Sequence, residues 1–383
     1  MPSGQSNALG TNIDYLMSGV SSINQRLMNM KSIEGISLFD NCPALDGYHC
    51  QTNSLAKIFH YHRKPLSEDM LLGLGAGMGF IYWHMKGSPE SGFGDYVFIG
   101  GRGNTKNFFQ DIGQRTGVKI VEKTTTSVKK AESALVEKLR EKEPVMVYGD
   151  MGFLPWFDLP EGYHFGGHTF VVCGFDGKDK CLASDMDQKM SGLKKGFYSS
   201  LSLDELREAR SSPHKPFPAK NAYLEFDFKG FHSPITEDVY SAIRQTIESE
   251  LNPPIKNIGI KGIRHTAKEI MKWPDMFEEK ELRMNLFTLY VFIEIGGTGG
   301  GCFRYMYSRF LEESAKTTGN NDLLRASAKI HESGKMFSEV GLLFENAEKE
   351  PYIRGKIQTA SEKFEEIAEI EEEAFDHLSI SVK

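Results

Sequence analysis

The sequence lacks the cysteine patterns expected of a disulfide scaffold or a cysteine-rich metal site. Its 383 residues include five cysteines, an odd number, and no two of them form a Cys-x-x-Cys pair. The first residues, Met-Pro-Ser-Gly, carry neither the basic segment nor the apolar segment of a secretory signal peptide. These absences favour a cytoplasmic protein whose thiols stay reduced.

Excess basic charge and long apolar runs are also missing. The formal net charge is −7, whereas a general nucleic-acid-binding protein usually presents a basic face. The longest apolar run, 286–295, is interrupted by Thr288 and Glu294 and falls far short of the roughly 20 residues of a membrane span. We therefore expect neither a nucleic-acid partner nor a membrane anchor. The oligomeric state, a homo-oligomer included, is left open.

The 38 glycines do not form a phosphate-binding motif. The alternating glycines of 73–79 lack the G-x-G-x-x-G spacing, and they follow a helix-like segment instead of a strand. The cluster Gly296–Gly301 has no following Gly-Lys-Ser/Thr, so a P-loop is not expected. This cluster predicts a tight joint between two helices, with the wall of a substrate channel as the alternative. No cofactor is expected.

What is present is an ordinary globular composition, with 40% hydrophobic and 25% charged residues. Strand-like and helix-like patterns alternate up to a proline-rich segment at 211–218, which is the best domain boundary. From Thr236 onward the hydrophobic spacing is helical. We expect an N-terminal arm with a helix over 1–35, a mixed α+β domain over 36–228 and an all-α domain over 229–383.

Cys50 is the first residue whose setting suggests chemistry. It follows an Asp-Gly turn at 46–47 and precedes Leu55, Ile58 and Phe59, which recur at helical spacing. A cysteine at a helix N-terminus is stabilised as a thiolate by the helix dipole and the free N–H groups. Cys50 is therefore a candidate nucleophile. The alternative is a buried structural cysteine, the more common fate of a lone cysteine.

A second informative stretch reads as a β-hairpin around an Asp-Gly turn at 176–177. His168 heads the first strand. A turn centred between these two residues places His168 opposite Asp185, and a shifted register places it opposite Asp187. Either carboxylate can orient the imidazole, which then serves as the base for Cys50. The structural alternative is a hydrogen-bonded turn histidine with aspartates that cap strand ends.

The order helix-borne cysteine, strand-borne histidine and carboxylate on the next strand is that of papain-like folds. A zinc site built from His164, His168, Cys173 and Cys181 is disfavoured. The glycines at 166–167 interrupt any helical histidine pair, and Cys173 lies on the opposite strand face from His168. No metal is expected.

Several motifs resemble the butirosin biosynthesis protein H-like family. Gly-Gly-His168 with its strand and Asp185 fit the N-terminal domain of this family, and residues 299–307 resemble the helical domain of unknown function that often follows it. The N-terminal motifs that carry the resemblance are Gly-Tyr-His-Cys at 47–50, Tyr-His at 61–62, Leu-Ser-Glu at 66–68 and Gly-Leu-Gly-Ala-Gly-Met-Gly-Phe-Ile-Tyr-Trp at 73–83.

The resemblance implies a papain-like cysteine acyltransferase of secondary metabolism. Cys50 would be the nucleophile, His168 the base and Asp185 the orienting residue. The donor would be an acyl thioester, carried by an acyl carrier protein or a CoA-like group, and the acceptor an amine. Two alternatives stay open: a papain-like amidase or peptidase that uses water, and a non-catalytic binding or scaffold protein on the same fold.

The residues that would bind the substrate carbonyl are less clear from the resemblance. Wider papain-like enzymes place a glutamine shortly before the cysteine to help form the oxyanion hole, and here position 44 is alanine. Backbone N–H groups of Cys50 or Gln51 would have to serve, or a side chain. The candidates for oxyanion or substrate contact are Gln51, His49, Asn41, Arg304 and Tyr82.

Overall fold

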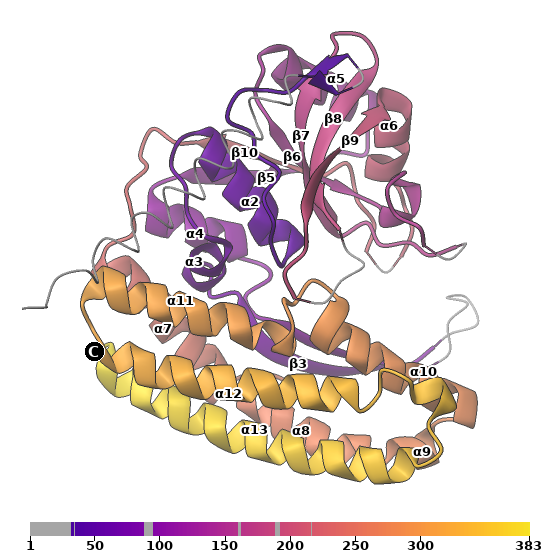
Figure 1. Ribbon diagram of the computed structural model, residues 1–383, viewed down its shortest axis with the longest axis vertical. Helices are drawn as coiled ribbons and strands as arrows, with labels where there is room; N and C mark the ends of the chain where they lie inside the picture. Colours follow the sequence, from indigo (N-terminus) through magenta and orange to yellow (C-terminus); the bar gives the residue numbers. More distant parts are fainter. Residues whose placement is uncertain (1–31, 34, 88–94, 160–161, 188–191, 216) are drawn as a thin grey trace, which may run out of the picture.

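The computed structural model describes residues 32–33, 35–87, 95–159, 162–187, 192–215 and 217–383. The predicted N-terminal helix within 1–35 lies outside these residues. The described chain forms a mixed α+β region followed by a helical region, so the α+β expectation is confirmed at that level (Figure 1). None of the described helices combines the length and apolarity needed to cross a membrane.

A six-stranded antiparallel sheet forms the centre of the N-terminal region. Two neighbouring buried strands of this sheet, β7 and β8, carry His168 and Asp185. The strand order is β5 (Lys119–Lys123), β10 (Tyr223–Asp227), β6 (Val145–Gly149), β7 (His168–Phe175), β8 (Lys180–Met186) and β9 (Gly196–Ser202). Two short strands, β1 (Ser32–Ile33) and β2 (Ile36–Ser37), pair with each other and precede the sheet in the chain.

Helices cover both faces of this sheet. Side chains alternate between the faces of a strand, and Val171 of β7 packs in the same core as Leu55 of α2 (Cys50–Tyr61). Phe170 packs instead with residues of α5 (Val128–Arg140) and α6 (Leu203–Ser211) on the other face. Coverage of both faces explains why β7 is buried along its whole length and mostly apolar after His168 and Thr169.

The hairpin of β7 and β8 is present, but the first expected register is wrong. Val171 pairs with Ser184, and a bulge follows Val172. Continuing this register places Asp187 opposite His168, as the shifted alternative expected. Asp185 then lies diagonally across from His168 on the same face of the sheet, within reach of a long side chain.

The register differs because the turn is longer than two residues. The Asp176 carboxylate accepts hydrogen bonds from the backbone N–H groups of Lys178, Asp179 and Lys180, at 2.8, 3.0 and 3.1 Å. This aspartate-centred loop replaces the tight Asp-Gly turn. The extra loop residues shift every pairing that follows, which a count from the turn centre does not anticipate.

Residues expected as two strands near 80 and 97 form a separate hairpin, β3 (Met78–Met85) and β4 (Tyr96–Arg102). It does not join the large sheet. In Figure 1 β3 lies among the helices of the C-terminal region, and Phe80 packs against the rings of Phe337 and Phe364. The hairpin therefore connects the sheet region with the helical region.

The helical region shares one continuous hydrophobic core with this hairpin and with α2 and α3. α11, α12 and α13 lie side by side (Figure 1). The helices are α7 (Thr236–Leu251), α8 (Gly259–Ile270), α9 (Trp273–Met276), α10 (Glu279–Tyr290), α11 (Arg304–Thr318), α12 (Asp322–Leu342) and α13 (Ile353–Ser381), and the N-terminal region adds α3 (Glu68–Leu74) and α4 (Phe108–Thr116). Short elements are η1 (Met151–Phe153), η2 (Val291–Ile295), η3 (Gly301–Phe303) and η4 (Ala347–Lys349).

Candidate active site

Cys50 is the first residue of α2, as the sequence predicts. Leu55, Ile58 and Phe59 are completely buried, so the apolar stripe of α2 anchors the helix on the sheet and holds its N-terminus in place. The first N–H groups of a helix have no acceptor within the helix. They point toward Cys50, where they favour a thiolate and can donate to a bound oxygen.

His168 and Asp185 form a buried hydrogen-bonded pair. Nε2 of His168 lies 2.8 Å from Oδ2 of Asp185, and each side chain is only 2% exposed. Trp156 donates its Nε1–H to the same carboxylate oxygen at 2.9 Å, and the N–H of Met186 donates to the other oxygen at 2.8 Å. The carboxylate is therefore fixed on Nε2 of the imidazole, which leaves Nδ1 for the thiol.

The electrostatics of Cys50 and His168 favour an ion pair. Burial lowers the pKa of His168, but the charge and hydrogen bond of Asp185, with a contribution from Cys50, raise that pKa to about 10. Burial raises the pKa of the Cys50 thiol, and hydrogen bonds and charge from His168 and the backbone of Thr169 bring it below its ordinary value. Between these two pKa values the site holds a thiolate and an imidazolium, the reactive pair of a thiol enzyme.

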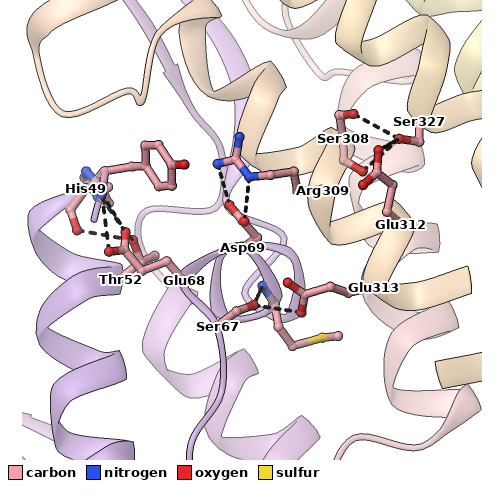
Figure 2. Close-up of polar contacts among 12 residues, drawn as sticks. His49, Thr52, Ser67, Glu68, Asp69, Ser308, Arg309, Glu312, Glu313 and Ser327 are labelled. Atoms are coloured by element: carbon pink, nitrogen blue, oxygen red, sulfur yellow. Dashed lines mark hydrogen bonds and ion pairs between the residues drawn. The ribbon is translucent and has the colours of Figure 1, made fainter. Parts of the chain in front are cut away.

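The turn before Cys50 is organised by the buried carboxylate of Glu68, the first residue of α3 (Figure 2). Glu68 accepts from the backbone N–H groups of Tyr48 and His49, both at 3.2 Å. It also accepts from Thr52 Oγ1 at 3.0 Å and from Asn53 Nδ2 at 2.7 Å. One side chain thus holds both sides of Cys50, and its negative charge suits a helix N-terminus.

The same short helix ties this turn to the helical region. Asp69 forms two hydrogen bonds with Arg309 of α11, at 2.7 and 2.9 Å, and the neighbouring Ser67 donates to Glu313 at 2.7 Å (Figure 2). The Arg309 guanidinium also lies 4.3 Å from the ring centre of Tyr48. The position of the turn before Cys50 therefore depends on α11, which lies more than 200 residues later in the chain.

The glycine cluster Gly296–Gly301 also reaches this turn. It follows the π-helix η2, which continues from α10, and it joins α10 to α11. A Cβ atom at Gly299 would lie 3.2 Å from Tyr48, and one at Gly297 would lie 3.2 Å from Nδ1 of His49. The cluster is a joint between two helices, and it also packs against the residues just before Cys50.

Of the candidates for substrate contact, the structure brings His49 and Gln51 to Cys50. The His49 ring lies 2.6 Å from Arg102 and 5.1 Å, centre to centre, from the ring of Phe303. Gln51 Nε2 lies 3.4 Å from the hydroxyl of Tyr148. Burial, with Arg102 beside it, holds the pKa of His49 well below its ordinary value, so the ring is neutral and accepts from the guanidinium.

The other three candidates lie elsewhere. The carbonyl of Asn41 is 3.3 Å from the ring of His60, at the far end of α2 and about 15 Å along the helix from its start. The hydroxyl of Tyr82 accepts from Trp273 at 3.3 Å within the helical region. Arg304 is fully buried in an ion pair with α13. Tyr82 and Arg304 are buried among other residues of the fold, whereas Asn41 is exposed.

The residues of the disfavoured zinc site also have other partners. Nδ1 of His164 lies 3.1 Å from Asp150, and the His164 ring stacks on His214 at 3.4 Å. Cys173 lies 3.5 Å from the carbonyl oxygen of Leu182, to which its thiol donates. Within the described ranges, no three His, Cys, Asp or Glu side chains are placed to bind one metal ion.

Arg102, at the end of β4, is a site residue that sequence reasoning missed. Its guanidinium lies over the ring of Phe108, 4.2 Å from the centre, and 5.7 Å from that of Phe303. Burial lowers the pKa of Arg102 to about 10, with opposing contributions from Cys50 and Tyr148, so the group stays charged near neutral pH. The one local signal was a charged residue among glycines after an apolar strand, at 100–103.

The comparisons with known proteins agree with this architecture. Residues 49–186 match the family model for the N-terminal domain of butirosin biosynthesis protein H, a span that contains Cys50, His168 and Asp185. Residues 204–378 match a domain of unknown function, DUF4872. No curated protein sequence matches the chain. The chain therefore belongs to the butirosin biosynthesis protein H-like family, with the N-terminal domain of that family followed by the domain of unknown function.

Proposed function

We propose that this protein is a cysteine-dependent acyltransferase of papain-like fold that passes an acyl group from a thioester to an amine. The observation that carries the proposal is the juxtaposition of Cys50, at a helix N-terminus, with a histidine held by a buried carboxylate. The family name, butirosin biosynthesis protein H, supports a biosynthetic enzyme of secondary metabolism. The donor would be an acyl carrier protein or CoA-like thioester.

In the first half-reaction the Cys50 thiolate attacks the thioester carbonyl carbon. A carbon–sulfur bond forms, and the carbonyl electron pair moves onto oxygen. When the tetrahedral intermediate collapses, the bond to the donor sulfur breaks. His168, which is protonated in the resting pair, gives its proton to the departing thiolate. The products are an acyl-enzyme on Cys50, a free donor thiol and a neutral imidazole.

In the second half-reaction a neutral amine attacks the acyl carbon. His168 takes the proton that the nitrogen loses, and Asp185 stabilises the resulting imidazolium. The carbon–Cys50 bond then breaks, which releases the amide and restores the thiolate–imidazolium pair. Transfer to an amine instead of water requires a site with few water molecules. The near-complete burial of His168 and Asp185 supports such a site.

The decisive experiment compares the full-length protein with Cys50→Ala, using a small N-acetylcysteamine thioester as donor. Intact-mass measurement should show one acyl group on the wild type and none on the variant. Cys181→Ala is a matched control. That thiol is fully buried, and burial raises its pKa to about 12, so its loss should leave acylation unchanged.

Addition of amines then separates the possible reactions. Faster loss of the acyl group with amide product supports the transferase. Release at an unchanged rate, giving only the free acid, identifies a hydrolase. Undiminished acyl transfer by Cys50→Ala contradicts the proposed nucleophile. A wild type that is neither acylated nor rapidly alkylated by iodoacetamide near neutral pH is a non-catalytic protein.

A further inference from the structure

We infer that Arg102 stabilises the negative charge that develops on the substrate carbonyl oxygen, in place of the glutamine missing before Cys50. This inference rests on the proposed acyl transfer. Its starting point is the contact between Arg102 Nη1 and His49 Nε2, at 2.6 Å, because His49 is the residue directly before Cys50. The guanidinium thus reaches the N-terminus of α2 from the neighbouring hairpin.

The guanidinium is held in a defined position. The ring of Phe108 supports it at 4.2 Å, and the ring of Phe303 lies 5.7 Å away. Phe108 comes from α4 and Phe303 from η3, directly before α11, so the N-terminal region and the helical region both hold the guanidinium in place. A donor fixed before the reaction begins costs little reorganisation in the transition state.

Arg102 lacks the carboxylate that usually accompanies a buried guanidinium. None of the described aspartates or glutamates forms an ion pair with it, and its solvent-shielded Nε has no hydrogen-bond acceptor among the described residues. The groups whose negative charge acts on Arg102 are Cys50 and Tyr148, and burial raises the pKa of the Tyr148 hydroxyl, which keeps that group neutral. A buried charge without a partner is costly. The Cys50 thiolate is therefore the anion that balances it.

The reaction moves this anion. When the S–C bond forms, the charge leaves sulfur and the carbonyl electron pair becomes an oxyanion beside it, still close to Arg102. When the acyl-enzyme forms, the negative charge passes to the donor sulfur and is neutralised there by the proton from His168, so Arg102 has no anion. Arg102 therefore stabilises both tetrahedral intermediates relative to the acyl-enzyme. Stabilisation relative to the acyl-enzyme lowers the barrier of the second half-reaction. In the first half-reaction the barrier falls because an oxyanion, whose charge is more localised than that of a thiolate, binds a guanidinium more strongly. The N–H groups at the start of α2 are the complementary donors.

The test uses full-length Arg102→Met and Arg102→Lys with two thioester donors, one with a neutral butyryl group and one with an anionic succinyl group. The acylation rate of Cys50 is followed by intact mass from pH 6 to 10, and iodoacetamide alkylation gives the thiolate fraction over the same range. We expect Arg102→Met to lower the high-pH plateau about 100-fold for both donors, and Arg102→Lys, which keeps the charge, to lose less.

Three results overturn the inference. In the first, the acylation rate of Arg102→Met reaches the wild-type plateau at high pH, and only the pH at which the rate rises is shifted. Arg102 then merely lowers the pKa of the Cys50 thiol. If the loss is confined to the succinyl donor, Arg102 is a receptor for a substrate carboxylate. An unacylated wild type would remove the proposed function itself, whereas an unaffected Arg102→Met removes only this inference.

A control variant tests whether any loss comes from removing a buried arginine. Arg115 lies near the end of α4 opposite to Phe108, and it donates to the carbonyl of Leu74 at 2.5 Å and to Gln245 at 2.6 Å. Arg115→Met should lower the unfolding temperature and leave the acylation rate of the folded protein unchanged. Unfolding curves for all variants show whether each one is folded during the assay.

Discussion

Two arginines of this protein, Arg304, which is fully buried, and Arg102, which is half-buried, differ in what surrounds them. Arg304, at the start of α11, makes a two-pronged contact with Glu371, at 2.7 and 3.0 Å. It also donates to the carbonyl oxygens of Gly79 and Cys302, at 2.7 and 2.9 Å. Burial lowers the pKa of Arg304, but Glu371 outweighs it and the net shift is upward. Its charge is satisfied entirely within the folded chain.

Arg102 has aromatic packing of the same kind but no carboxylate. Both guanidinium groups lie over phenylalanine rings, Arg304 over Phe337 at 4.5 Å and Arg102 over Phe108 at 4.2 Å. The two arginines differ in the anion that balances their charge. For Arg304 it is the carboxylate of Glu371, and for Arg102 it is the Cys50 thiolate, which takes part in the proposed reaction. A paired arginine stabilises the fold, and an unpaired one beside a nucleophile is available to the reaction.

The largest effect that tests this comparison is expected from Glu371→Leu. The substitution leaves Arg304 buried without its anion and removes the acceptor of Ser333. The free energy of unfolding in urea should fall by roughly 3–5 kcal/mol. Under the same conditions Arg102→Met should be neutral or slightly stabilising, because it removes a buried charge that has no carboxylate partner.

The exposed glutamate of an ion pair on α13 provides the control. Glu373 contacts Lys329 at the surface, and Glu373→Gln should change the unfolding free energy little. If Glu371→Leu and Arg102→Met lower the free energy of unfolding equally, the distinction between the two arginines is contradicted.

A smaller, pH-dependent effect is expected at Glu250, whose charge acts on Arg304. Neither carboxylate oxygen of Glu250 has a hydrogen-bond donor among the described residues. Burial raises the pKa of Glu250 to about 8, and the nearby Arg304 only partly opposes this. In an unfolded chain the pKa is about 4.3. The folded protein therefore binds more protons between these values, and its stability falls as the pH rises through that range.

Glu250→Gln removes this dependence. Relative to the wild type, the variant should gain roughly 2–4 kcal/mol of stability between pH 4 and pH 9, with the gain complete above pH 8. Urea unfolding at pH 5, 7 and 9 measures it, with the exposed Glu248→Gln as control. A difference that does not change with pH would show that Glu250 is ionised in the folded protein throughout.

The smallest effect on stability is expected from Arg309→Met, which breaks the pair with Asp69. The Arg309 side chain is 32% exposed, so the loss should be only about 0.5–1 kcal/mol. Because Arg309 also packs on Tyr48, the acylation rate should fall several-fold. Glu313→Gln, which weakens the neighbouring contact with Ser67, is the control. A rate loss as large as that of Arg102→Met would make positioning of the turn as important as the charge.

Local patterns in the sequence were sufficient to predict the helix that carries Cys50 and the hairpin that carries His168. The helix after Cys50 follows from its apolar spacing, and the hairpin after His168 follows from two β-prone runs around an Asp-Gly pair. The partner of His168 was harder to predict. An aspartate-centred loop and a bulge decide the register of β7 and β8, and neither leaves a clear signal in residue types.

The environment of Cys50 depends on contacts between residues distant in the chain. Arg102 meets His49 across 53 positions, and Arg309 meets Asp69 across 240. Hydrophobic spacing predicts which face of an element is buried, but it does not predict which other element covers that face. The sequence thus predicted the elements that carry the proposed nucleophile and its proposed base. Tertiary packing alone brought the β3–β4 hairpin and α11 to the turn before Cys50, because those contacts come from a core shared by both regions of the molecule.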